Sequence, residues 1–216
     1  MKKNLTELVF ILDRSGSMAG LEGDTIGGFN TMIEKQKGEP GEAIISTVLF
    51  DNECDVIHDR LKLEAVPGLT RKEYYVRGCT ALLDAVGGAI HHIGNVHKYA
   101  REEDRPEKTL FVITTDGMEN ASRRYTYDKV RAMIQRQKEK YGWEFLFLGA
   151  NIDAAREAAR FGIQPEMAAD YCADSMGTGA VYEAVTEAVC DFRACRPMAS
   201  GNWRKRVDED FRKRGR

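Results

Sequence analysis

Short apolar runs that alternate with helical segments restrict this chain to a small set of folds. The runs are LVFIL (8–12), IISTVLF (44–50), TLFVITTDG (109–117) and WEFLFLGAN (143–151). Continuous apolar runs of this length are typical of strands that are covered on both faces. After the first run, Ile26, Phe29 and Ile33 follow helical spacing. A helix between two such strands is the crossover that parallel pairing requires, so the pattern predicts a parallel sheet.

The remaining segments complete an α/β pattern. Only three residues separate the strand 44–50 from the next candidate strand, 54–63, so these two are expected to form an antiparallel hairpin at a sheet edge. A weak strand is expected at 167–173, and apolar residues at helical spacing predict further helices in 82–93, 130–137, 153–162 and 181–192. The predicted fold is a doubly wound, Rossmann-like α/β fold: a mostly parallel six-stranded sheet with one antiparallel edge strand and helices on both faces.

One domain is expected over residues 1–196. A chain of 216 residues fills one core well and is short for two domains. Beyond residue 197 the apolar residues are sparse, and seven Lys and Arg stand against three acidic residues. Residues 197–216 are therefore predicted to form a basic, polar C-terminal tail that is solvated, with at most a short helix.

Charge and hydropathy argue against two classes of partner. The chain has 32 Lys and Arg against 34 Asp and Glu, so no excess charge indicates nucleic acid or an anionic membrane. No stretch approaches the roughly 20 apolar residues of a membrane span. The N-terminus superficially resembles a signal peptide, but Glu7 and Asp13 interrupt its apolar run and no small-residue cleavage site follows. Five cysteines without a C-x-x-C pair fit reduced thiols. We expect a cytoplasmic protein with no nucleic-acid or membrane partner.

Oxygen-bearing side chains follow two of the predicted strands and precede one helix. Asp13, Ser15 and Ser17 come directly after the first strand, Asp116 ends the strand 109–117, and Thr80 precedes the helix that begins near residue 82. In a doubly wound sheet, ligands bind outside the carboxyl ends of the strands where the strand order reverses. The residues after the first strand either cap a helix or hold a hard cation such as Mg²⁺, which takes oxygen ligands.

Three motifs resemble one known family. They are D-x-S-x-S at 13–17, G-C-T-A-L around Thr80 and T-D-G at 115–117. In this order they are similar to the metal-ion-dependent adhesion site (MIDAS) of von Willebrand factor type A (vWA) domains. The resemblance covers about residues 5–195, and small stand-alone bacterial members of the family are the most similar.

The resemblance implies a Mg²⁺ site, with Mn²⁺ or Ca²⁺ as substitutes. It implies Ser15 and Ser17 as direct ligands and Thr80 and Asp116 as ligands bound directly or through water. It also implies that Asp13 holds the metal, through water or directly, and hydrogen-bonds the serines. In this family the open coordination position takes an Asp or Glu of a partner protein. The expected function is metal-dependent protein binding without catalysis. The sequence indicates neither the partner nor the oligomeric state.

Two other functions are compatible with some of the same residues. A Mg²⁺-dependent hydrolase of the phosphatase type uses an aspartyl nucleophile and an acid two residues later, but Ser15 stands at that second position and no phosphate-binding loop motif is present. A structural module without metal is the other alternative. Glu119 and Asn120 follow T-D-G and either rim the site or simply begin a turn.

Overall fold

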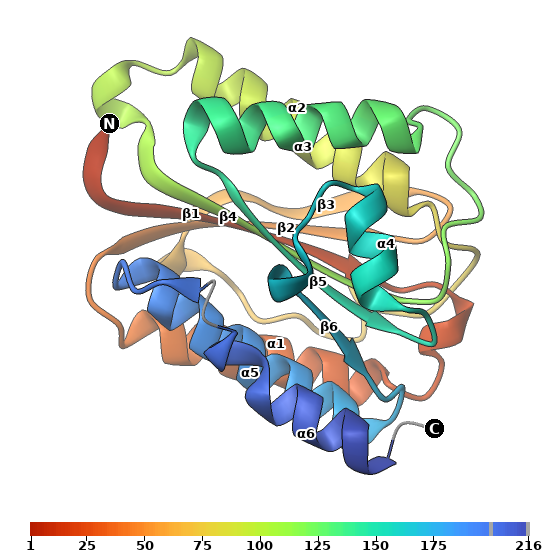
Figure 1. The fold of residues 1–216 in the computed structure, drawn as a ribbon. Helices are drawn as coiled ribbons and strands as arrows, with labels where there is room; N and C mark the ends of the chain where they lie inside the picture. Colours follow the sequence, from red (N-terminus) through yellow and green to blue (C-terminus); the bar gives the residue numbers. More distant parts are fainter. Residues whose placement is uncertain (199–200, 215–216) are drawn as a thin grey trace.

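A mixed six-stranded sheet forms the centre of the structure, a computed structural model that describes residues 1–198 and 201–214 (Figure 1). The strand order is β3-β2-β1-β4-β5-β6. The strands are β1 (Lys2–Asp13), β2 (Glu42–Phe50), β3 (Cys54–Lys62), β4 (Pro106–Asp116), β5 (Glu144–Ala150) and β6 (Ala168–Tyr171). Five strands are parallel and β3 is antiparallel at the edge. The predicted strand arrangement is confirmed.

Helices cover both faces of this sheet. The helices α2 (Leu82–Tyr99), α3 (Tyr127–Tyr141) and α4 (Ala154–Arg160) lie over one face (Figure 1). The other face is covered by α1 (Glu22–Lys37), α5 (Ser175–Arg193) and α6 (Lys205–Arg214). Each of the longer helices turns an apolar stripe toward the sheet, as Leu82, Val86, Ile90 and Ile93 do in α2. The predicted doubly wound α/β fold is therefore confirmed.

The strand β1 is buried along most of its length because it pairs with strands on both sides. Leu8 lies opposite Ile45 of β2 and Leu110 of β4, and all three side chains are buried. The strand order reverses here, because β2 and β3 lie on one side of β1 whereas β4, β5 and β6 lie on the other. The carboxyl ends of β1 and β4 are Asp13 and Asp116, so the reversal places both carboxylates at one edge of the sheet.

The C-terminal segment differs from the solvated tail that its composition predicts. Trp203 and Val207 are only 2% and 1% exposed and belong to the hydrophobic core, and α6 packs against α5 and β6. The expectation of a solvated tail is wrong for these residues. Residues 199–200 and 215–216 of the predicted tail lie outside the described residues, and the boundary after residue 196 stays a prediction.

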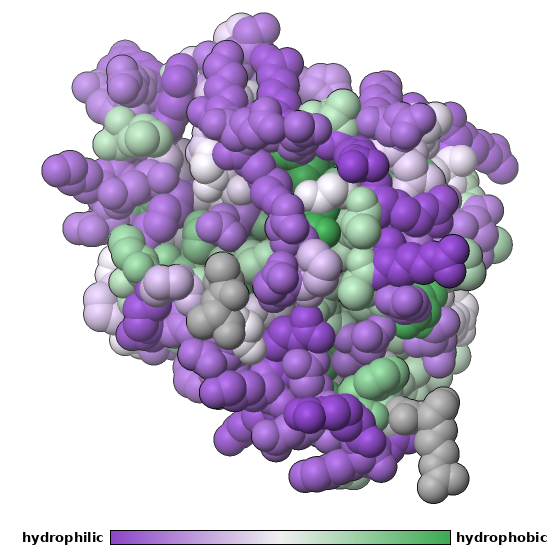
Figure 2. All heavy atoms as spheres, in the orientation of Figure 1, coloured by the Kyte–Doolittle hydropathy of each residue, from purple (hydrophilic) through white to green (hydrophobic). Residues whose placement is uncertain are grey.

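The molecular surface is mostly hydrophilic. On the face seen in Figure 2, hydrophobic side chains show mainly near the centre and are surrounded by polar ones. Among the described residues, no helix is both long and apolar enough to cross a membrane.

Candidate functional site

The Asp13 carboxylate joins the turn after β1 to the end of β4. One oxygen, Oδ1, accepts a hydrogen bond from the Ser15 backbone N–H at 2.7 Å. The other, Oδ2, accepts from the Thr115 hydroxyl at 2.8 Å and from the Asp116 backbone N–H at 3.1 Å. The Asp13 side chain therefore bridges the turn after β1 and the end of β4.

The two serine hydroxyls of the turn lie together beside Asp116. The Oγ atoms of Ser15 and Ser17 are 3.1 Å apart, and the Ser17 hydroxyl donates to the Asp116 carbonyl oxygen. Four of the five candidate ligands, Asp13, Ser15, Ser17 and Asp116, are therefore linked directly by hydrogen bonds.

Thr80 reaches the same place through its neighbours in the chain. The Gly16 N–H donates to the Gly78 carbonyl oxygen at 3.0 Å, which joins the turn after β1 to the segment just before Thr80. From the side of β4, the Asn120 side-chain oxygen accepts from the Thr80 N–H at 2.9 Å, and the Asn120 N–H donates to the Thr80 carbonyl oxygen at 3.0 Å. The three sequence motifs therefore meet at one edge of the sheet.

The turn after β1 does not act as a helix cap. The helix α1 begins only at Glu22, and no side chain caps its N-terminus by a hydrogen bond. The short 3-10 helix Gly16–Met18 has Ser15 at its N-cap position, again without a capping hydrogen bond from the side chain. The alternative in which these side chains serve as caps is wrong.

Asp116 carries an oxygen whose hydrogen-bonding capacity is unused. Its Oδ1 accepts from Asn151 Nδ2 at 2.5 Å, whereas its Oδ2 is buried and has no hydrogen-bond partner among the described residues. A buried polar atom without a partner is uncommon, because desolvation is not compensated. A cation at this position would provide the missing interaction.

Burial raises the pKa of both carboxyl groups. For Asp13, hydrogen bonds from Ser15, Thr115 and the Asp116 N–H oppose the rise without cancelling it. For Asp116, burial is again the main cause, and the nearby charge of Asp13 raises the pKa further while the bond from Asn151 lowers it. Two such groups favour a cation between them, because positive charge relieves both the desolvation and the mutual repulsion.

Comparisons with solved structures bear on the fold. The mussel byssus proximal thread matrix protein 1, in a form with a zinc-occupied MIDAS motif, is 12% identical with a TM-score of 0.58, over 86% of this chain and 46% of that one. The vWF domain of the pilus tip protein Mfa5 from Porphyromonas gingivalis is 11% identical with a TM-score of 0.57, over 85% of this chain and 94% of that domain. A von Willebrand factor type A structure from Catenulispora acidiphila is 15% identical with a TM-score of 0.55, over 84% of this chain and 41% of that one.

The chain has the von Willebrand factor type A fold. It spans less than half the length of the mussel protein. No protein-family model and no curated protein matches the sequence. The resemblance that the three motifs indicated is confirmed at the level of the fold, and the ligand roles of the five residues stay predictions.

Sequence reasoning missed several residues that shape the edge of this vWA fold. Asn151 follows β5 and bonds Asp116, and it could have been found by the rule that located Asp116, because it too follows a strand. Tyr74 and Tyr171 donate to the carbonyl oxygens of Asp13 and Thr115, at 2.5 Å and 3.3 Å. No local pattern marks these tyrosines, since they lie far from their partners in the sequence.

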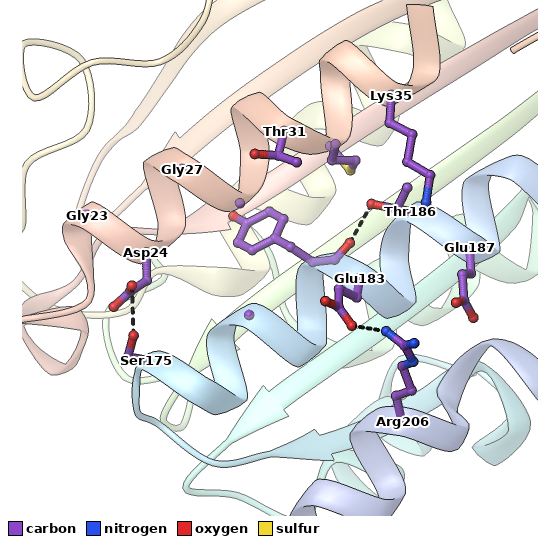
Figure 3. Close-up of a pocket in the computed structure, with 14 residues that line it drawn as sticks. Gly23, Asp24, Gly27, Thr31, Lys35, Ser175, Glu183, Thr186, Glu187 and Arg206 are labelled. Atoms are coloured by element: carbon purple, nitrogen blue, oxygen red, sulfur yellow. Dashed lines mark hydrogen bonds and ion pairs between the residues drawn. The ribbon is translucent and has the colours of Figure 1, made fainter. Parts of the chain in front are cut away.

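A separate hollow lies between α1, α5 and α6 of the vWA fold (Figure 3). Its volume is about 590 Å³, and its wall includes glycines of α1 and α5 together with polar side chains. Ser175 bonds Asp24 and Arg206 pairs with Glu183 along this wall. None of the five candidate ligands lines the hollow, so it is distinct from the site at the sheet edge.

Proposed function

We propose that this chain is a metal-dependent protein-binding module. In this proposal Mg²⁺ is held by Asp13, Ser15, Ser17, Thr80 and Asp116, and it captures an Asp or Glu side chain of a partner protein. The observation that carries the proposal is the buried Oδ2 of Asp116, which has no hydrogen-bond partner among the described residues and lies beside a second buried carboxylate and two hydroxyls.

The donor set suits a hard divalent cation. All five candidate side chains offer oxygen, the ligand atom that Mg²⁺ and Mn²⁺ prefer. Among the described residues no group of three or more His, Cys, Asp and Glu forms a softer site. Two carboxylates and three neutral hydroxyls just balance the charge of a divalent ion, so an additional anion is welcome. When bound, the ion supplies a coordination position for a carboxylate from outside.

A non-catalytic role fits these residues better than phosphoryl hydrolysis. The position two residues after Asp13 holds Ser15, and its hydroxyl cannot replace the acid that such a hydrolase needs. The zinc-occupied MIDAS motif of the mussel protein supports a divalent ion on this fold. We therefore propose binding without chemical change.

We also propose that the protein works in the cytoplasm. Its five cysteines, all within the described residues, are free thiols. A reducing compartment keeps thiols in this state.

Addition of Mg²⁺ or Mn²⁺ is expected to raise the melting temperature. At a free metal concentration about 100 times Kd, binding to the native state alone adds about 2.7 kcal/mol to the free energy of unfolding, which corresponds to about 5–11 °C for a chain of this size.

The stabilisation by metal is also expected to depend on pH. Because the pKa values of Asp13 and Asp116 are raised, protons compete with the metal for these groups. The gain should therefore shrink as the pH falls, which differential scanning calorimetry can follow. An unchanged melting temperature with either metal would support the metal-free structural module instead.

Capture of a partner is expected to depend on the metal. The tagged protein is used to pull down proteins from a lysate of its own host in Mg²⁺ and, in parallel, with a chelator. A specific partner should be retained only with Mg²⁺, and substitution of its acidic contact residue by Asn or Gln should release it. Equal retention with and without chelator contradicts the proposal.

A further inference from the structure

The loop that carries Thr80 is held by three other loops of the structure. Backbone groups of residues 77–81, here named the Thr80 loop, bond partners from the turn after β1, the β2–β3 turn and the segment after β4. Written donor first, the bonds are Arg77 N to Arg14 O (2.9 Å), Gly16 N to Gly78 O (3.0 Å), Cys79 N to Asn52 Oδ1 (2.5 Å), Thr80 N to Asn120 Oδ1 (2.9 Å), Asn120 N to Thr80 O (3.0 Å) and Ala81 N to Asp51 O (2.8 Å).

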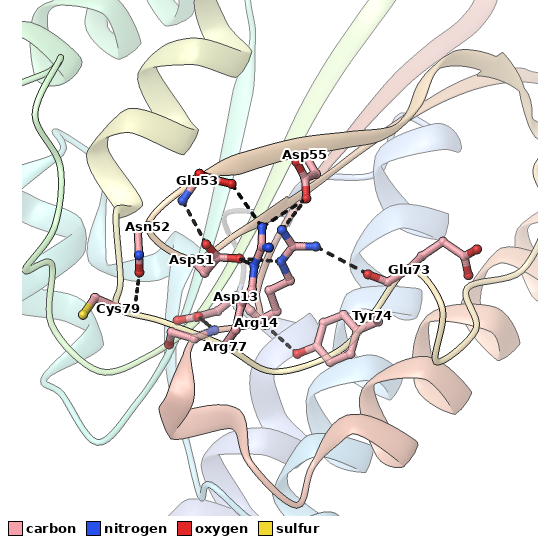
Figure 4. A network of polar contacts seen from close by, with 11 residues as sticks. Asp13, Arg14, Asp51, Asn52, Glu53, Asp55, Glu73, Tyr74, Arg77 and Cys79 are labelled. Atoms are coloured by element: carbon pink, nitrogen blue, oxygen red, sulfur yellow. Dashed lines mark hydrogen bonds and ion pairs between the residues drawn. The ribbon is translucent and has the colours of Figure 1, made fainter.

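Asp51 contacts both ends of the Thr80 loop. Its backbone carbonyl oxygen accepts from the Ala81 N–H, and its side-chain Oδ2 accepts from Arg77 Nε at 2.8 Å (Figure 4). The same Oδ2 accepts from Arg14 Nε at 2.7 Å. Arg14 stands between Asp13 and Ser15 in the chain. The Asp51 carboxylate therefore connects the Thr80 loop, through Arg77, with the turn after β1, through Arg14.

The ion pair of Arg14 and Asp51 is buried, so separating the two charges would cost free energy. The side chains of Arg14 and Asp51 are 1% and 2% exposed. Burial alone would raise the pKa of Asp51, but the hydrogen bonds from Arg77, the Glu53 N–H and Arg14 outweigh it, and the pKa is lowered. Arg14 and Arg77 also contact the carboxylate of Asp55, but that side chain is 44% exposed. Without the charge of Asp51, the buried guanidinium of Arg14 would keep only this solvent-screened carboxylate as its charged partner, which is unfavourable for a buried charge.

The Thr80 loop also fits closely against the β2–β3 turn. Gly78 has a φ of 69°, and a Cβ built on it would lie 2.2 Å from Asn52 Oδ1. The chain can approach so closely only because no side chain is present here. The Asn52 side chain then accepts from the Cys79 N–H, directly before Thr80.

We propose that Asp51 is a positioning residue that sets the Thr80 hydroxyl against the turn of Ser15 and Ser17. It acts through Arg14, Arg77 and the Ala81 N–H and does not touch the metal. This inference rests on the proposed function, because it concerns the same metal site. It adds a residue outside the three motifs, on a turn that none of them includes.

The test measures affinity for Mn²⁺ alone, by calorimetric titration, in a double-mutant cycle. Asp51→Asn keeps the shape of the side chain and removes its charge, and it is expected to weaken binding by about tenfold or more, as loss of a residue that orients a metal ligand typically does. In a Thr80→Ala background the same substitution is expected to have almost no further effect, because Thr80 no longer contributes a ligand to be positioned.

A matched control is Glu7→Gln, which also breaks a buried ion pair. Glu7 is fully buried and pairs with Arg60 at 2.7 Å, but it lies six residues before Asp13 on β1, or about 20 Å along the strand. The substitution Glu7→Gln should lower the melting temperature and leave the Mn²⁺ affinity unchanged. If Asp51→Asn does not fold, Arg77→Gln breaks the same link from its partly exposed side and takes its place in the cycle.

The outcomes separate the two proposals. Wild-type protein that binds no Mn²⁺ overturns the proposed function, and the role of Asp51 falls with it. Wild-type binding that Thr80→Ala weakens, together with unchanged affinity in Asp51→Asn, overturns the positioning role alone. Effects of Asp51→Asn and Thr80→Ala that simply add also overturn it, because a general structural loss would act independently of Thr80.

Discussion

Asp116→Asn is expected to abolish metal binding and, at the same time, to stabilise the metal-free protein. The substitution keeps the oxygen that accepts from Asn151 and removes the negative charge. In the metal-free protein this charge is unfavourable, because Asp116 is 1% exposed, its Oδ2 has no partner among the described residues, and its pKa is raised by burial and by the charge of Asp13. The gain comes from removing the charge alone, because the Asn NH2 group would be as unpartnered as Oδ2 is. We expect a gain of about 1 kcal/mol or less.

Two measurements check this result together. Urea unfolding in a chelator gives the free energy of unfolding of the metal-free protein, and titration with Mn²⁺ gives the affinity. At a metal concentration that stabilises the wild type by about 2.7 kcal/mol, Asp116→Asn should gain nothing, and partner capture should be lost with the metal.

Asp170→Asn serves as the matched control. Asp170 lies on the edge strand β6 of the same sheet, and burial also raises the pKa of its carboxyl group. Its Oδ1 accepts a hydrogen bond from the Ala154 N–H at 2.7 Å. It belongs to none of the three motifs, so the substitution should leave Mn²⁺ affinity unchanged. Retained metal binding in Asp116→Asn, or equal loss in Asp170→Asn, would argue against the assigned role of Asp116.

Much of the fold follows from local sequence patterns. Apolar runs with few polar residues predicted the buried strands, and the three-residue link before Cys54 predicted the antiparallel edge, which β3 confirms. The site edge was also predictable, because Asp13 and Asp116 end apolar runs and parallel strands place their carboxyl ends together. These inferences need only the apolar pattern of the sequence and the lengths of the connections between its segments.

The residues that hold the candidate ligands in place could not be predicted from local sequence patterns. No motif includes Asp51, which lies in the three-residue link between β2 and β3. Its contacts are with Arg14 and Arg77, which lie 37 and 26 positions away in the sequence. Glu119 and Asn120 were undecided between a rim and a turn. The structure gives Asn120 contacts to Thr80, while Glu119 accepts from the Leu83 N–H at the start of α2. Such roles are set by tertiary contacts that no short motif encodes.

The prediction for the C-terminal segment was wrong because it relied on the excess of basic residues and overlooked the helical spacing of the apolar ones. Trp203, Val207 and Phe211 recur every four residues, a helical stripe that could have been recognised. The basic residues around them are used in contacts within the protein: Arg206 pairs with Glu183, and Arg214 pairs with Asp174 at 2.5 Å. An excess of Lys and Arg therefore does not indicate a free tail where acidic residues of other elements face it.

Trp203→Ala is expected to destabilise the protein by about 3–5 kcal/mol, the usual cost of removing a large buried aromatic side chain. Trp203 is 2% exposed, lies in the short 3-10 helix Asn202–Arg204 just before α6 and is part of the core. Its loss should also loosen α6 from α5 and β6, since Val207 is the one other fully buried side chain among residues 201–214. Urea unfolding and the melting temperature give the size of the effect.

Lys213→Ala is the control within the same segment, because Lys213 is exposed and its loss should change stability by less than about 0.5 kcal/mol. A chain that ends at residue 196 removes α6 entirely and should be at least as unstable as Trp203→Ala, because it uncovers the apolar surface beneath α6 as well. If both the truncation and Trp203→Ala unfold like the wild type, residues 1–196 form a self-sufficient domain and the predicted boundary holds. If both are strongly destabilised, the segment after residue 196 is part of the domain, and its basic character reflects ion pairing across the helix layer.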